Sequence, residues 1–336
     1  MEAAEAEPQP GEPIEVGGVH IAPGEREEVE IHVEQLATGP WISIPTVVLN
    51  GRLAGPTVCV SAAVHGDEIN GVEAVRKLLM ELRPADIAGT VIAVPVVNEL
   101  GFMAGSRYLP DGRDLNRSFP GSPRGSLASR IAHLLMKEII SRCDLAIDLH
   151  CGSGRRGNLP QIRADLDNPM TEEAAQVFGA PAAIHARVRD GSLREAATQH
   201  GVSMLLFEGG ESNRFDNYAI DSAFDGVRRV LAHLGMIDNA PGISSPTFVS
   251  RETRWVRAAR GGLLRLEVEL GAMVEQRQVL GYFSDIYGRR NLAVRAPVAG
   301  LLIGMNRSPL INQGDALFHL AEPEEGAVGG HHVDDD

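Results

Sequence analysis

A histidine and a glutamate three positions apart stand in the stretch His65-Gly66-Asp67-Glu68. An apolar run rich in β-branched residues (58–64) leads into it, and apolar residues at helix-face spacing (72–79) follow. We therefore expect His65 and Glu68 at the carboxyl end of a strand, in the turn that opens a helix, where open α/β sheets bind ligands. Imidazole nitrogen and carboxylate oxygen are ligands of Zn²⁺, and a hydrolytic zinc site keeps one position for water. Taken alone, the pair also fits a polar turn with a helix-capping carboxylate.

Two more predicted strand ends carry residues of the same kind. His150 closes one strand, and alternation puts Asp148 on the same face, where it could orient the imidazole. Glu208 ends a strand predicted at 203–207 and is followed by two glycines. A carboxylate there can take a proton from metal-bound water and pass it to a leaving amine. Glu211 competes for this role but is predicted to lie outside the strand. A structural histidine and a surface carboxylate are the alternatives.

A long loop rich in glycine and arginine (101–121) offers Arg107, Arg113, Asn116 and Arg117. Long loops without structure of their own are usually functional in compact domains. Guanidinium groups bind carboxylates through paired hydrogen bonds, and an arginine near a metal can stabilise an oxyanion. The alternative is that these side chains are simply solvated.

The elements that must position these residues alternate between strand and helix. This alternation predicts an α/β fold with a mixed, mostly parallel sheet and helices on both faces. Beyond Pro241, short apolar–polar alternations with glycines predict an all-β module that resembles the lipoyl/biotinyl barrel-sandwich. This module contains no lysine, so it cannot carry lipoate or biotin. The expected organisation is a disordered acidic arm (1–13), a zinc-dependent catalytic α/β domain (14–240), a β-rich module near the active site (241–322) and an acidic tail (323–336).

Composition excludes several classes of partner and location. The 336 residues carry a formal net charge of −14, which argues against binding to nucleic acid. The acidic, proline-rich N-terminus does not read as a signal peptide, and no apolar run approaches the roughly 18 residues of a membrane span. Three sparse cysteines predict no disulfide framework. We therefore expect a cytoplasmic protein without a membrane partner. The β module is a candidate surface for a homo-oligomer.

In this order, the chain contains the motifs His65-Gly66-Asp67-Glu68, Ser106-Arg107-Tyr108, Asp114-Leu115-Asn116-Arg117, Asp148-Leu149-His150 and Phe207-Glu208-Gly209. Over roughly residues 40–320 it resembles the succinylglutamate desuccinylase/aspartoacylase family, within the zinc-carboxypeptidase-like fold. The resemblance implies one Zn²⁺ per chain, with His65, Glu68 and His150 as its ligands.

The same resemblance implies roles for five further residues. Glu208 matches the general base that activates water together with zinc, and Arg107 matches the arginine that polarises the scissile carbonyl. Asn116 and Arg117 match the pair that holds a substrate carboxylate. Arg194, upstream of the Glu208 strand, is a looser match for a further anion contact.

The function implied is a zinc-dependent deacylase that cleaves the linear amide of a small N-acyl amino acid or a related amide. A zinc carboxypeptidase acting on peptides is the alternative, since it shares ligands and base. A non-catalytic binding protein on the same fold is a third hypothesis. Arginines in segments 155–158, 187–189 and 285–290 favour a carboxylate-bearing small molecule as ligand. Neither the acyl group nor the amino acid can be named from the sequence.

Overall fold

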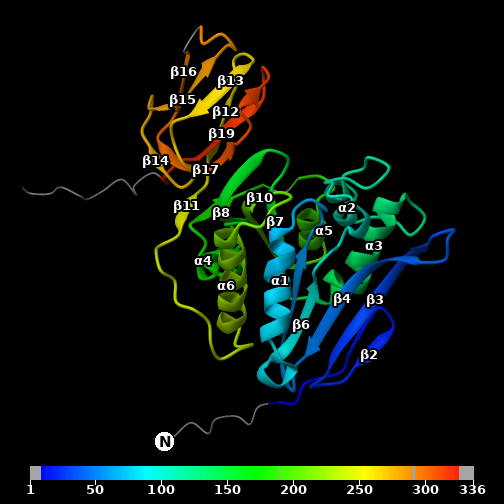
Figure 1. Cartoon of the computed structure of the whole chain (residues 1–336). Helices are drawn as coiled ribbons and strands as arrows, with labels where there is room; N and C mark the ends of the chain where they lie inside the picture. The colour runs from blue at the N-terminus through cyan, green and yellow to red at the C-terminus, as the bar shows by residue number, and fades with distance from the viewer. Residues whose placement is uncertain (1–8, 188, 290–291, 325–336) are drawn as a thin grey trace, which may run out of the picture.

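The computed structural model describes residues 9–187, 189–289 and 292–324 (Figure 1). In that part of the chain, one mixed sheet of 13 strands runs through the molecule, and β12-β19-β17-β8-β10-β7-β5-β6-β4-β3 is the order along its main path. The strands of the α/β part are β3 (Arg26–Gln35), β4 (Trp41–Asn50), β5 (Leu53–Ala62), β6 (Ala88–Val94), β7 (Leu145–Gly152), β8 (Arg156–Ala164), β9 (Ala182–His185) and β10 (Ser203–Glu211), with β11 (Phe248–Ser250) beside β9. A separate pair, β1 (Ile14–Val16) and β2 (Val19–Ile21), is antiparallel.

The centre of the sheet is parallel. β10, β7, β5 and β6 pair in parallel, whereas β8 and β4 join this centre in the antiparallel direction. Every residue of β7 is buried, as expected for a strand covered on both faces. Alternation along β7 sends Leu145, Ile147 and Leu149 to one face, and sends Asp148 and His150 to the other.

Helices cover both faces, as predicted. α1 (Asn70–Glu81), α4 (Pro169–Phe178) and α6 (Asn217–His233) pack with Leu145, Ile147 and Leu149 in one apolar core. α3 (Leu127–Glu138) and α5 (Leu193–Gln199) pack on the opposite face in a second core. Figure 1 shows α1, α4 and α6 side by side along the sheet. The mixed α/β fold expected from the sequence is therefore confirmed.

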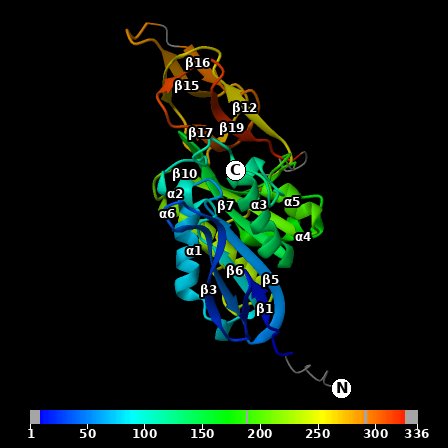
Figure 2. The same cartoon turned by 90° about the vertical axis from the view of Figure 1, so that its right-hand side faces the viewer.

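The C-terminal region forms two small layers around a core of its own. Four strands, β16-β15-β13-β18, make an antiparallel sheet, and the other strands extend the large sheet. Figure 2 shows this module projecting beyond the α/β part. β17 pairs with β8, so the large sheet is continuous from the module into the α/β part. The strands of the module are β12 (Thr253–Arg257), β13 (Gly262–Leu266), β14 (Met273–Val274), β15 (Val279–Ser284), β16 (Leu292–Arg295), β17 (Gly300–Asn306), β18 (Leu310–Ile311) and β19 (Ala316–Ala321).

Several elements differ from the expected ones. β5 ends at Ala62 rather than at His65, and Ala63 takes a positive φ of 50° in the turn that follows. β10 continues through both glycines to Glu211, with a register shift after Glu208, so the expectation that Glu211 lies outside the strand is wrong. β8 begins at Arg156, so most of the arginine-containing segment 155–158 lies in a strand.

The long loop contains two short helices, α2 (Glu99–Met103) and a 3-10 turn over Leu115–Arg117. Two other 3-10 turns cover Pro84–Asp86 and Ile140–Arg142. No helix among the described residues is both long and apolar enough to cross a membrane.

Both predicted tails are only partly described. The amide of Gly11, which falls within the predicted arm, donates to the carbonyl of Arg52 at 2.8 Å. Residues 1–8 of that arm and 325–336 of the acidic tail lie outside the described residues.

Gly66 is required by a close approach of two backbone segments. A Cβ atom at this position would lie 1.9 Å from the carbonyl carbon of Gly101 and 2.1 Å from the amide of Phe102, both in α2. The obstacle is backbone, which cannot rotate aside as a side chain can. The turn that carries His65 and Glu68 is therefore held directly against the loop that carries Arg107.

We expect Gly66→Ala to lower the free energy of unfolding by about 3 kcal/mol, the upper part of the range for overpacking a rigid interior. Urea unfolding followed by circular dichroism measures this change. Gly242→Ala is the matched control, because a Cβ there meets no atom within 4 Å. Equal unfolding midpoints for the two variants would contradict the close approach.

Candidate metal centre and catalytic cavity

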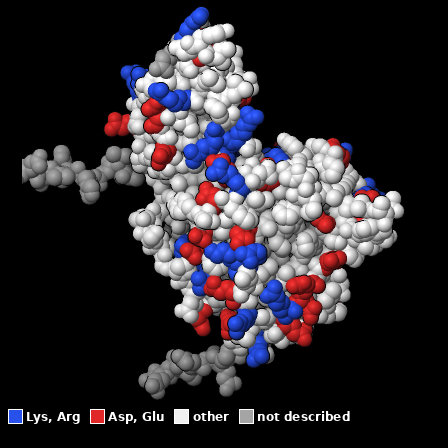
Figure 3. All heavy atoms as spheres, viewed as in Figure 1, with Lys and Arg blue, Asp and Glu red and all other residues white. Residues whose placement is uncertain are grey.

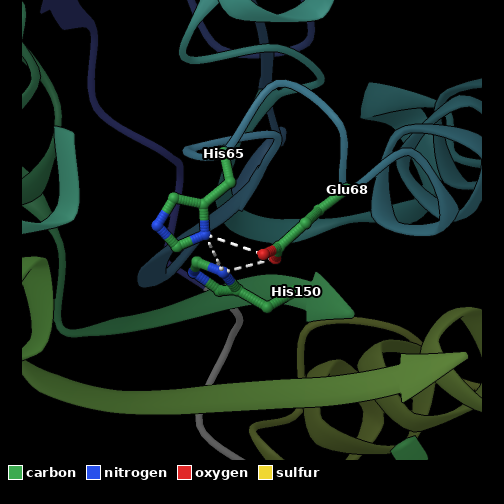
Figure 4. A group of neighbouring side chains, drawn as sticks. All are labelled: His65, Glu68 and His150. Atoms are coloured by element: carbon green, nitrogen blue, oxygen red, sulfur yellow. Dashed lines mark hydrogen bonds and ion pairs between the residues drawn. The ribbon is translucent and has the colours of Figure 1, made fainter. Parts of the chain in front are cut away.

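Three ligand atoms of the predicted metal site face one another in the structure (Figure 4). Nδ1 of His65 lies 2.9 Å from Oε1 of Glu68, and Nδ1 of His150 lies 2.8 Å from Oε2 of the same carboxylate. The two Nδ1 atoms are 3.2 Å apart. All three side chains are at most 4% exposed. Two imidazole nitrogens and one carboxylate at this spacing make a candidate metal site among the described residues.

A second carboxylate contacts the other ring nitrogen, Nε2, of each histidine. Nε2 of His65 donates to Asp114 Oδ1 at 3.1 Å, and Nε2 of His150 donates to Asp148 Oδ2 at 2.6 Å. The hydroxyl of Ser61 donates to the other oxygen of Asp148 at 2.7 Å. A proton on Nε2 leaves the lone pair of Nδ1 free for a cation, so these carboxylates select the tautomer that a metal ligand needs.

Charge compensation shifts the pKa values of the three side chains in this cluster. Burial opposes ionisation of Glu68, but the two histidines outweigh it and hold the pKa of Glu68 well below its ordinary value. Burial also opposes a charge on His65, but Glu68 and Asp114 outweigh it and raise its pKa. In the same way, Asp148 and Glu68 raise the pKa of His150 well above its ordinary value despite burial. The cluster therefore presents an ionised carboxylate.

Arg107 reaches the same cluster from the loop. Its Nη1 lies 3.2 Å from Glu68 Oε1 and donates to Ser153 Oγ at 2.7 Å. Its Nε and Nη2 donate to Asp114 Oδ2 at 3.2 and 2.9 Å. Asp114 therefore holds both His65 and Arg107. His65 and Arg107 together keep the pKa of Asp114 below its ordinary value, against the effect of burial.

Glu208 lies beside this cluster because of strand register. It is paired with His150 across the parallel β10–β7 ladder, and paired residues point to the same face of a sheet. Its Oε2 accepts the side-chain amide of Asn158 on β8 at 2.8 Å. The carboxylate is thus fixed on the face of the sheet that carries His150.

One cavity of about 460 Å³ is lined by all eight residues to which the family resemblance gave a role. Asn116 is buried, and its Oδ1 accepts the amide of Leu193 at 2.9 Å, whereas Arg117 is exposed at the cavity. Arg194 is buried, and burial lowers its pKa to about 10, with the charge of Arg163 adding to the effect. The predicted residues that line the cavity are His65, Glu68, Arg107, Asn116, Arg117, His150, Arg194 and Glu208.

Other expected contributors lie elsewhere. Arg113 is exposed and pairs with Asp111 rather than facing the cavity. Residues 285–289 do not line it, and Tyr287 is 71% exposed. Arg290 lies outside the described residues.

No sequence motif singled out Arg163, Trp255 or His319 as a site residue. All three line the cavity, and two of them come from the C-terminal module. A weak signal was present at residues 155–158, where Arg156 and Asn158 do line the cavity. Positive charge therefore surrounds much of the site, and Figure 3 shows arginine and lysine side chains gathered where the module meets the α/β part.

Comparison with known proteins assigns the chain to a class. A model of the succinylglutamate desuccinylase/aspartoacylase catalytic domain matches residues 54–234, more than half of the chain. The N-alpha-acetyl-L-2,4-diaminobutyric acid deacetylase of Halomonas elongata is 31% identical over 314 residues, which cover 89% of this chain and 91% of that protein.

Two solved structures share the fold over nearly the whole chain. A succinylglutamate desuccinylase/aspartoacylase from Rhodobacter sphaeroides has a TM-score of 0.81 at 28% identity, covering 89% of this chain and 95% of that one. The product-bound ectoine utilization protein EutE (DoeB) of Ruegeria pomeroyi has a TM-score of 0.81 at 26% identity, covering 94% and 99%.

The chain belongs to the succinylglutamate desuccinylase/aspartoacylase family, as its motifs predicted. Membership makes it an amidohydrolase of the deacylase type, which confirms the predicted enzyme class.

We expect Asp148→Asn to weaken zinc binding about 10- to 100-fold, because an amide cannot hold His150 in the ligating tautomer as a carboxylate does. Competition between the protein and a chromophoric chelator measures the dissociation constant. Asp221→Asn is the control, since Asp221 lies on α6 and pairs with the side chain of Lys77. Unchanged zinc affinity in Asp148→Asn would show that the outer carboxylate has no part in metal binding.

Proposed function

We propose that the protein is a zinc-dependent deacylase that hydrolyses the amide bond of a small N-acyl amino acid. The observation that carries this proposal is that three metal-type donors and Glu208 line a single cavity, with Glu208 paired to His150 in the sheet. A zinc ion held by His65, Glu68 and His150 would polarise the acyl carbonyl and lower the pKa of a bound water.

Glu208 is the proposed general base. Its position beside His150 and its hydrogen bond from Asn158 support the role, because a base must be held within reach of the proton that it takes. It removes the proton from the attacking water, then returns a proton to the departing amine. Asn158 occupies one oxygen of the carboxylate, which leaves the other for these transfers.

Arg107 is the proposed partner of the carbonyl oxygen. Its guanidinium is fixed by Asp114 and Ser153, next to Glu68, so it can donate to negative charge that develops on that oxygen without reorganising. The same Asp114 orients His65, so one carboxylate sets the position of a metal ligand and of the arginine together.

Asn116 and Arg117 are the proposed site for the substrate carboxylate, and Arg194 is a further anion contact. The amide of Leu193 fixes Asn116 through Oδ1, which leaves its Nδ2 as the donor for a ligand. Nη1 of Arg194 is buried without a protein partner among the described residues. A named relative removes an acetyl group from an N-acetylated amino acid, which supports an N-acyl amino acid here.

The size of the cavity supports a small substrate over a peptide. At about 460 Å³ it falls within the roughly 300–1,000 Å³ of small-molecule sites. Thr253, Trp255 and His319 of the C-terminal module contribute to its wall, where a peptide would need an open groove.

We also propose that the protein is located in the cytoplasm. The three cysteines, Cys59, Cys143 and Cys151, are buried and free, which suits a reducing compartment. Self-association through the C-terminal module is a further prediction, which sedimentation would test.

The deciding experiment measures primary-amine release by zinc-loaded protein from a panel of N-acyl amino acids, with short peptides as controls. We expect turnover of acyl amino acids and little turnover of peptides. Peptide turnover alone would replace the deacylase with a carboxypeptidase.

Glu208→Gln should retain zinc but lose about 10²- to 10⁴-fold in kcat, the usual contribution of a positioned acid or base. Glu211→Gln is the matched control in the same strand, because Glu211 pairs with Arg214 and Arg307 instead. Metal analysis and amine release are measured on both variants. If the Glu208 variant kept near-normal kcat, the base would have to be another group.

A further inference from the structure

The residue that holds the proposed base lies on a strand beside the C-terminal module. Nδ2 of Asn158, on β8, donates to Oε2 of Glu208 at 2.8 Å. A carboxylate offers only acceptors, so the amide nitrogen of Asn158 faces it and Oδ1 faces elsewhere. On the other side of β8, Asn158 is opposite Gly304 of β17, a strand of the module. One side chain therefore binds the catalytic strand β10 and borders the module strand β17.

An irregular register in β8 turns Asn158 toward the base. Glu208 on β10 is opposite Gln161. Gly210, two residues further on, is opposite Asn158, which is three residues back along β8, so β8 contains one extra residue here. The bulge falls at Leu159-Pro160, where proline is tolerated because it has no N–H to give to a ladder. Strict alternation from Gln161 would put Asn158 on the face opposite to Glu208, whereas the bulge lets both residues line one cavity.

Gln161 ties this bulge to the module. Its side chain is fully buried, and Nε2 donates to the carbonyls of Leu159 at 3.1 Å and Ile303 at 2.9 Å. Leu159 lies in the bulge, and Ile303 lies on β17 directly before Gly304. The irregularity that directs Asn158 is therefore held against the module strand by a buried hydrogen bond.

Gly304 leaves the space that the carboxamide of Asn158 occupies. A Cβ atom at position 304 would lie 3.0 Å from Asn158 Oδ1, closer than ordinary van der Waals contact, and 3.3 Å from His319 Cβ. The carboxamide thus lies between the carboxylate of Glu208 on one side and the bare backbone of β17 on the other. A side chain at position 304 would displace Asn158 from the position in which it binds Glu208.

We infer that Asn158 is a positioning residue for the general base, and that β17 of the C-terminal module sets its place through Gly304 and Gln161. Asn158 acts on the reaction only through Glu208. It holds one carboxylate oxygen, which fixes the rotation of the carboxylate and leaves the other oxygen directed at the attacking water. This inference rests on the proposed deacylase function, which makes Glu208 the base.

The first test measures kcat and KM of zinc-loaded variants on the best substrate of the N-acyl amino acid panel. Asn158→Ala should lower kcat about tenfold, as for a lost hydrogen bond to a charged group. It should change KM less than about twofold, because the base acts in the transition state. In the Glu208→Ala background the same substitution should change the residual kcat less than about twofold, since its effect passes through Glu208. A merely structural role predicts the same loss in both backgrounds.

A second pair of variants tests the part played by the module. Gly304→Ala should lower kcat about three- to tenfold by displacing Asn158. In the Asn158→Ala background, where Oδ1 is absent, Gly304→Ala should change kcat less than about twofold. Gly261→Ala is the matched control in the same module and should leave kcat unchanged. Its Cβ would lie 3.3 Å from the carbonyl oxygen of Ile311, a similarly tight contact, but Gly261 is not among the residues that line the catalytic cavity.

Urea unfolding of zinc-loaded protein gives a measurement that needs no turnover. Asn158→Ala and Glu208→Ala together should change the unfolding equilibrium constant less than the product of their separate effects, with a coupling of about three- to tenfold. Separate effects that simply multiply would show that the hydrogen bond does not hold the carboxylate. If Asn158→Ala does not fold, Asn158→Ser replaces it, because the shorter hydroxyl side chain does not extend to Oε2 of Glu208.

The outcomes separate the two proposals. Normal kcat in Asn158→Ala, an equal loss in the Glu208→Ala background, or an effect of Gly304→Ala that persists without Asn158 would overturn the inference and leave the deacylase. Absence of turnover across the panel would overturn the proposed function, and the unfolding measurements would still decide whether Asn158 holds Glu208.

Discussion

The parallel pairing of β5, β7 and β10 is the constraint on which the site depends. Parallel strands bring their carboxyl ends to one edge of the sheet, and here those ends carry His65 and Glu68, then His150, then Glu208. Register fixes the last step, since Glu208 is opposite His150 and must share its face. Three chain segments far apart in sequence therefore meet at one edge of the sheet, with His65 and Glu68 in the short turn between β5 and α1.

Because the side chains at this edge are buried, each charged group there needs an oppositely charged or hydrogen-bonding partner to be stable. An unpaired buried ion costs several kcal/mol, so Glu68 is stable only between two histidines and Arg107. The histidines are held in turn by Asp114 and Asp148. The partners of these side chains thus hold the three candidate metal ligands close together.

The sequence predicted what local patterns encode. Apolar strands, alternation and glycine turns located His65, His150 and Glu208 near the carboxyl ends of strands, although β5 ends before His65, and β7 and β10 continue past His150 and Glu208. The mixed α/β fold followed from the same patterns. The prediction for β10 was wrong because Gly209-Gly210 indicated the end of the strand. In the structure the strand continues past a bulge to Glu211. β8 was missed because its first residues, an arginine, a glycine and an asparagine, resemble a turn.

Local sequence patterns do not predict how β8 pairs with β17 of the C-terminal module. Arg163 and His319 lie 156 positions apart in sequence and come together because β17 and β19 extend the sheet beyond β8. The C-terminal module is therefore part of the cavity wall rather than an appendage, and its side chains are fixed by the same hydrogen-bonded ladder that fixes Asn158. Because β8 lies between the module and β10, the ladder holds His319 in fixed register with Asn158, which donates to Glu208. A shift in that ladder would move the cavity wall and the partner of the proposed base together.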